Sequence, residues 1–115
     1  MSYLLQKGRQ TRKLAEIRLA LVACGLCSID KQAAVLGLSR STAYHVITAA
    51  HKNTGVSARI IGRMLDSPRL PPSVRAILCE YAVEKAAGLY GSSSTARRRF
   101  RSAMSEVAEV ENNYS

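Results

Sequence analysis

Apolar residues recur along this chain at the three- and four-residue spacing of α-helices, and we find no convincing strand alternation. The first such stretch covers residues 11–24, where Leu14, Ile17 and Leu21 share one face and Gly25 provides a stop. Cys24 continues the same spacing, so we expect it in the core. The pattern therefore predicts a helix from about Thr11 to Cys24.

Three further helices are predicted before a run of prolines. Ser28 is placed to cap a helix from Ile29 to Leu36, which Gly37 ends, and Ser39 is placed to cap the next one. That next helix covers Arg40 to about Lys52, and a fourth covers residues 57–66.

Proline then interrupts the pattern, because it cannot continue a helix and restricts the residue before it. The break covers residues 67–72, and a fifth helix runs from Pro72 to about Gly88. A Gly-Ser joint at 91–94 leads to a last helix over about 96–110. The residues expected to face inward in these two helices are Val74, Ile77, Leu78, Tyr81, Ala96, Phe100, Ala103, Met104 and Val107.

We therefore predict an all-α fold, a helix-turn-helix-containing bundle of about four N-terminal helices followed by two further helices. The 115 residues are 47% apolar and include one Phe and no Trp, which favours small helices around a core of aliphatic residues. The expected parts are a basic arm (1–13), a helix-turn-helix domain (14–66), a Pro-rich break (67–72) and a helical extension (73–115) for dimerisation or extra DNA contact.

The charge balance points to a polyanionic partner. Seventeen Lys and Arg stand against eight Asp and Glu, a net charge of +9. Nucleic acid is the first interpretation, an anionic membrane surface the second and a generally basic protein the third. The apolar run at 19–27 is too short to span a bilayer, and three cysteines are too few for a disulfide scaffold. We expect a cytoplasmic protein without membrane partners.

The most informative stretch is residues 28–47, where two short helices meet across a Gly-Leu-Ser turn. Ala33 is small where the helices would approach, Gly37 accommodates a positive φ, and Leu38 is apolar where the turn meets the core. This spacing is typical of a helix-turn-helix, whose second helix enters the major groove of DNA. Helical hairpins that bind no DNA share the pattern.

Residues 14–65 resemble the four-helix DNA-binding domain of LuxR/FixJ-type response regulators. The similarity rests on Gly25-Leu26, on Ala33 through Leu36-Gly37-Leu38-Ser39, on Thr42 and on Gly55-Val56-Ser57-Ala58-Arg59. It implies that Arg40–Lys52 is the recognition helix, that Thr42 and Arg59 contact phosphates, and that the helix after Gly55 is the dimer face. The chain departs from the family at Ala43 and His45, in a longer first turn, and in its C-terminal extension.

The predicted DNA-binding residues are the polar residues of the recognition helix with its flanks, and a set of surrounding cations. Base edges specify the sequence, whereas cations that contact phosphates supply affinity. The first set is Ser39, Arg40, Ser41, Thr42, Tyr44, His45, Thr48, Lys52 and Arg59. The additional candidate phosphate contacts are Lys7, Arg9, Arg12, Lys13, Arg63, Arg97, Arg98, Arg99 and Arg101.

The arginines at 97–101 open the last predicted helix and the glutamates at 106, 109 and 111 close it. This order opposes the helix macrodipole, so stability within that helix does not explain it. The arginines are expected to contact nucleic-acid backbone, or two such helices are expected to pair antiparallel in a homodimer. A solvated or frayed helix end is the plain alternative.

No catalytic constellation, cofactor motif or metal site is expected. Cys24 and Cys27 have the spacing of a zinc or redox pair, but a structural zinc needs four ligands and no second pair is present. Cys27 is expected in the turn between helices. We therefore predict a non-enzymatic, dimeric regulator that binds double-stranded DNA. The alternatives are an adaptor that binds a protein partner through residues 73–110, and a DNA-binding accessory subunit of a phage or mobile element.

Overall fold

The computed structural model describes residues 3–52, 55–91 and 93–113, with side chains at all of these except 3–5, 7, 49–52 and 107–113. The described residues are helical without a strand, which confirms the predicted all-α class. The helices are α1 (Tyr3–Ala23), α2 (Ile29–Leu36), α3 (Arg40–Lys52), α4 (Ala58–Leu65), α5 (Pro72–Ala86) and α6 (Ser94–Asn113).

The first helix is eight residues longer at its start than the sequence pattern predicts. It begins at Tyr3 rather than at Thr11, so residues 3–13 are helical. Gln10 occupies the same helical face as Leu14 and Ile17, and all three are buried. The apolar spacing does not predict these first turns of α1, because the buried position is occupied by Gln10 rather than by an apolar residue.

The other boundaries agree with the sequence pattern to within about three residues, and local capping signals explain several of them. Ser28 accepts a hydrogen bond from the backbone N–H of Lys31, and Ser57 accepts one from that of Ile60, so both are N-caps. Gly37 ends α2 in the left-handed region with φ of 69°. Pro72 opens α5 at a position where its missing N–H costs nothing.

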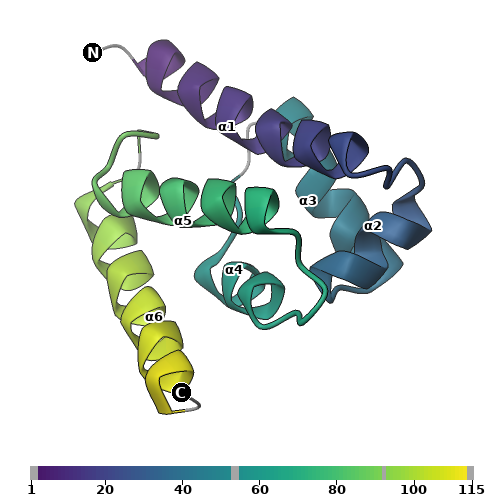
Figure 1. The fold of residues 1–115 in the computed structure, drawn as a ribbon. Coiled ribbons are helices and arrows are strands. Elements are labelled where there is room, and N and C mark those ends of the chain that lie inside the picture. The colour runs from purple at the N-terminus through teal and green to yellow at the C-terminus, as the bar shows by residue number, and fades with distance from the viewer. Residues whose placement is uncertain (1–2, 53–54, 92, 114–115) are drawn as a thin grey trace.

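Helix α5 lies between the first helix and the helices on the C-terminal side of the molecule. It packs against α1 on one side and against α4 and α6 on the other, while α3 packs on α1 and α2. Figure 1 shows α6 on the opposite side of the molecule from α2 and α3. One hydrophobic core includes residues from both sides of the proline break, such as Leu36, Ile61 and Leu78.

A buried polar network fastens α5 to α1 and to the segment before α4. The hydroxyl of Tyr81 donates to Oε1 of Gln10 at 3.0 Å and accepts from the backbone N–H of Val56 at 2.9 Å. Lys85 Nζ donates to the carbonyl of Val56 at 2.7 Å. The ring of Tyr90 stacks on that of Tyr81, with centroids 5.2 Å apart. The buried hydroxyl of Tyr81 and the backbone N–H and carbonyl of Val56 are therefore all hydrogen-bonded, as burial requires.

Two predicted core positions are wrong. Cys24 is exposed, because α1 ends at Ala23 and Gly25 turns the chain away with φ of 82°; its Sγ lies 3.9 Å from Ser73 Oγ. Ala96 is exposed because it lies in the first turn of α6, ahead of Phe100, which is buried. Val107 lies outside the described side chains. Val74, Leu78 and the other predicted inward residues are buried or half-buried.

Candidate nucleic-acid interface

The turn between α2 and α3 has the geometry that its sequence indicates. Ala33 is 5% exposed where the two helices pack together, and Leu38 is buried beneath the turn. The backbone N–H of Leu38 donates to the carbonyl of Ala33, and that of Gly37 donates to Ala34. A Cβ added at Gly37 would lie 3.1 Å from the Cβ of Ser67, so both the positive φ and the space favour glycine.

Helix α3 divides into an apolar inner face and a polar outer face. Ala43 and Val46 are buried and Ile47 is half-buried against the core. Arg40, Tyr44 and His45 are exposed, with Tyr44 56% exposed. Tyr44 and His45 also meet edge to face, their ring centroids 6.3 Å apart. The structure therefore brings these three predicted contact residues together at the surface of one helix. Ser41 is exposed beside them.

Three hydroxyl-bearing residues of the predicted site already have hydrogen-bond partners. The hydroxyl of Ser39 donates to that of Thr42 at 2.9 Å and accepts from the backbone N–H of Thr42, which caps the first turn of α3. The hydroxyl of Thr48 donates to the carbonyl of Tyr44 at 2.7 Å. Both threonines are half-buried. A hydroxyl oxygen keeps acceptor capacity in such a bond, but the Thr48 proton is committed to the preceding turn.

A carboxylate next to Arg40 escaped the sequence analysis. Arg40 Nε lies 3.5 Å from Oδ1 of Asp30, and the two side chains are 71% and 72% exposed. Asp30 belongs to the first turn of α2, where a negative charge is favourable. A pair this exposed is weak and breaks easily. In the structure this ion pair keeps the guanidinium of Arg40, the fixed positive charge at the start of α3, next to the first turn of α2.

The cations of α1 do not form one uniform surface. Lys13 is only 15% exposed and lies 2.8 Å from Glu80, 3.3 Å from Glu16 and 3.9 Å from Glu84. These carboxylates raise the pKa of Lys13 and compensate its charge within the chain. The side chain joins α1 to α5 in this structure, and its role as a phosphate contact stays a prediction. Arg12 and Arg63 are exposed and Arg9 is half-buried. The side chains of Lys7 and Lys52 lie outside the described residues.

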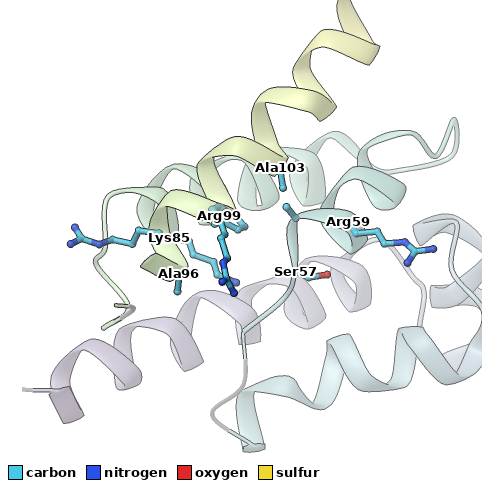
Figure 2. Close-up of a pocket in the computed structure, with 9 residues that line it drawn as sticks. Ser57, Arg59, Lys85, Ala96, Arg99 and Ala103 are labelled. Carbon is cyan, nitrogen blue, oxygen red and sulfur yellow. The ribbon is translucent and has the colours of Figure 1, made fainter. Parts of the chain in front are cut away.

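Helix α4 carries Arg59 but offers little apolar surface. Ala58, Ile61, Met64 and Leu65 are buried against the rest of the chain, where α4 packs on α2, α5 and α6. The apolar dimer face that the family resemblance implies for this helix is covered inside the chain. Arg59 itself is exposed, and Figure 2 shows its side chain pointing away from Arg99 of α6.

Two of the four arginines at the start of α6 have roles within the fold. Nε of Arg101 donates to the carbonyl of Ala86 at 2.9 Å, and Arg97 lies against Gly88, so both face the C-terminal end of α5. Carbonyls at a helix end carry partial negative charge, which favours a cation there. This tertiary contact offsets the unfavourable order of charges along α6. Arg98 and Arg99 are exposed.

Two buried polar residues position the predicted interface and were given no role by the sequence analysis. Nε2 of Gln32 donates to the carbonyl of Leu26 at 2.8 Å and so fixes the turn into α2. The hydroxyl of Ser67 donates to the carbonyl of Val35 at 2.6 Å and joins the proline break to the end of α2. The only sequence signal was a glutamine among apolar positions of a short helix.

Searches of the described residues identify no group of three potential metal-binding side chains and no helix long and apolar enough to cross a membrane. Cys24, Cys27 and Cys79 are exposed free thiols. Comparison of the chain with known protein families, with curated proteins and with solved structures found no match. The geometry of α2, α3 and their surroundings is therefore the basis for proposing a function.

Proposed function

We propose that this protein is a small sequence-specific DNA-binding transcriptional regulator, acting as a homodimer, whose helix α3 enters the major groove. The observation that carries the proposal is the division of α3. Arg40, Tyr44 and His45 are exposed together, while Ala43 and Val46 hold the helix on the core. A helix anchored in this way presents its N-terminal outer face to base edges.

Roles on DNA follow from the chemistry of each side chain. The Arg40 guanidinium suits a bidentate contact to guanine, a contact worth about 1–3 kcal/mol of discrimination. Tyr44, His45 and Ser41 supply hydrogen-bonding groups beside it, and the Thr42 hydroxyl, which accepts from Ser39, keeps its own proton to donate to a phosphate. Exposed cations such as Arg12, Arg59 and Arg63 supply sequence-independent affinity through phosphates.

The test is fluorescence anisotropy on a duplex obtained by selection from random sequence. The wild type should bind the selected duplex more tightly than a scrambled one, and Arg40→Ala should reduce that preference by about tenfold or more, as expected for a lost base contact. Arg98→Ala is the matched control. It removes one guanidinium from α6, a candidate for phosphate contact away from α3, so the affinity for both duplexes can fall while the preference between them should stay unchanged.

Weak binding to every duplex, steeply dependent on salt and indifferent to Arg40, would reduce the site to a basic surface. A salt series separates the two cases, because each phosphate contact adds roughly 0.9 to the slope of log K against log salt. A palindromic selected site would support the homodimer. Among the described side chains, the large apolar ones that are exposed are Leu19, Val22 and Val83, together with Tyr44.

The adaptor alternative has less support among the described residues. It requires an exposed apolar groove among Val74, Ile77, Tyr81, Phe100 and Met104. Val74, Tyr81 and Phe100 are buried and the other two are half-buried, so these side chains belong to the core. The accessory-subunit alternative shares the DNA-binding face, and only the identity of its partners distinguishes it from the regulator.

A further inference from the structure

An open groove of about 450 Å³ lies where the start of α4 meets the end of α5 and the first half of α6 (Figure 2). Its volume is within the ~300–1,000 Å³ typical of small-molecule sites. Ala96 and Ala103 provide apolar surface there, with the buried Ala58 and Phe100 beneath. The cationic residues of the lining are Arg59, Lys85, Arg97 and Arg99. The lining contains no acidic residue among the part of the chain that the structure describes.

The position of Arg97 is the strongest evidence for a ligand in this groove. Its Nε is buried and has no hydrogen-bond acceptor among the described residues. A Cβ placed on Gly88 would lie 2.7 Å from Cδ of Arg97, so the side chain lies directly against the backbone at that glycine. A buried donor without an acceptor is costly in a protein interior, and a small shift of the half-buried Arg97 side chain toward the groove would bring this donor to an anionic oxygen.

The cations of the groove suit an anion with several oxygens. A guanidinium presents its donors in a rigid fork that matches phosphate, and Arg97 and Arg99 contribute two such forks from one helix. No carboxylate of the described side chains lies within ion-pair distance of either one. Lys85 already donates to the carbonyl of Val56, so it adds positive charge to the site without being required as a donor.

We infer that this groove binds a phosphate ester of mononucleotide size. The phosphate oxygens accept hydrogen bonds from Arg97 and Arg99, and the ring system of the ligand packs on Ala96 and Ala103, the exposed and half-buried apolar residues of the lining. The ligand is either a free nucleotide or a nucleotide within a single strand, since both present the same chemistry. The site is separate from α3, because α6 packs on α4 and α5 whereas α3 packs on α1 and α2.

The experiment is isothermal titration calorimetry of the full chain with 5′-AMP, beside adenosine and inorganic phosphate. One AMP should bind per chain, and each fragment should bind about tenfold more weakly or worse, because each loses one half of the site. The side-chain Nε–H resonance of Arg97 should shift when AMP is added.

Arg99→Ala and Arg98→Ala form a matched pair of neighbouring, exposed arginines that differ in whether they line the groove. Arg99→Ala should weaken AMP binding about tenfold, the scale of a lost charge-assisted contact, and Arg98→Ala should change it less than about twofold. Equal losses in both variants, equal affinity for inorganic phosphate and AMP, or no AMP binding at all would overturn the inference. Unchanged thermal midpoints confirm that both variants fold.

Competition with a single-stranded oligonucleotide identifies the source of the ligand. Displacement of AMP that depends on Arg99 supports a nucleotide within a strand, and retention of AMP supports a free nucleotide. Arg40→Ala should bind AMP as the wild type does. Failure of the DNA-binding proposal at α3 is therefore distinguishable from failure at this groove.

Discussion

At the scale of single residues, three buried polar side chains hold the predicted interface in place. Gln10 accepts from Tyr81, Gln32 donates to Leu26, and Ser67 donates to Val35. Each bond joins segments that are separated in the sequence or by a turn. Because a buried polar atom must find a partner, these residues specify where the helices meet as well as that they meet.

Gly37→Ala tests the turn that separates α2 from α3. Alanine at this position would have to adopt a left-handed backbone conformation, and its Cβ would lie 3.1 Å from Cβ of Ser67. We expect the free energy of unfolding to fall by about 1–2 kcal/mol, measured by urea denaturation.

Gly8→Ala is the matched control, because Gly8 lies inside α1 with nothing within 4 Å of the added Cβ. A helix interior favours alanine over glycine, so this variant should gain about 0.5–1 kcal/mol. A loss of similar size in both variants would mean that the backbone conformation of Gly37 is not the cause.

At the scale of helices, each element obtains its boundaries locally and its roles from its neighbours. Ser28, Ser39 and Ser57 start helices by accepting backbone hydrogen bonds within a few residues. The function of α6 arginines, by contrast, depends on the end of α5, which lies more than ten residues earlier in the chain. The sequence pattern of α6 alone therefore predicts its span to within about three residues but does not explain the order of its charges.

Asp30→Asn tests the contact between α2 and α3. Removing the carboxylate beside Arg40 should free the guanidinium and tighten DNA binding by up to about fivefold, since an exposed pair is worth ~0.2–1 kcal/mol. Fluorescence anisotropy measures the change. Asp66→Asn removes the same charge at the end of α4 and should have a smaller effect. Equal gains would assign the effect to net charge alone.

Phe100→Ala tests how α6 is attached. Phe100 is 7% exposed in the core, and Lys85 Nζ lies 4.7 Å from its ring centroid. Truncating a buried aromatic residue costs about 3–5 kcal/mol, so urea denaturation should show a loss of this size. Amide exchange along α6 should accelerate. Ser102→Ala, an exposed position in the same helix, should have little effect on either measurement.

At the scale of the whole molecule, a single core receives side chains from both sides of the proline break. The contact between α1 and α5 is the polar part of this assembly. Tyr81 bonds to Gln10, Lys13 pairs with Glu80, and the hydroxyl of Tyr90 donates to Glu84. Of these residues Tyr81, Tyr90 and Lys13 titrate in the alkaline range, so the assembly has a predictable dependence on pH.

The stability of the protein should fall above about pH 10. Burial raises the pKa of Tyr81 from 10.0 to about 12, and burial with the bond to Glu84 raises the pKa of Tyr90. The bond to Glu80 raises the pKa of Lys13. A raised pKa means that the folded state holds its proton more tightly. The part of the resulting stabilisation that comes from Tyr81 is complete below about pH 10 and is lost as the pH rises through 12.

Urea denaturation over a pH series measures this loss. The free energy of unfolding should be nearly constant to about pH 9 and then decline. Tyr81→Phe should be less stable at neutral pH, because it leaves the Val56 N–H without its partner, and should decline less steeply above pH 10. Tyr44→Phe, at an exposed position, should follow the wild type; a stability curve that stays flat above pH 10 would contradict the assignment.

The sequence by itself determined the helical class, the spans of five helices to within a few residues, and the division of α3 into two faces. Those features follow from apolar spacing, capping residues and prolines, which act within a few positions of the chain. The sequence also placed Arg40, Tyr44 and His45 on an outer face, and the three side chains are exposed there.

Only the tertiary structure decided which polar residues are used inside the chain. The first turns of α1 were missed because Gln10 needs Tyr81 to be buried, 71 positions away. Lys13 was considered only as a phosphate contact, because Glu80 and Glu84 join it only when α5 packs on α1. The groove of Arg97 and Arg99 likewise exists only where α4, α5 and α6 meet. Periodicity tells which side of a helix is covered, but the covering partner comes from the packing of distant segments.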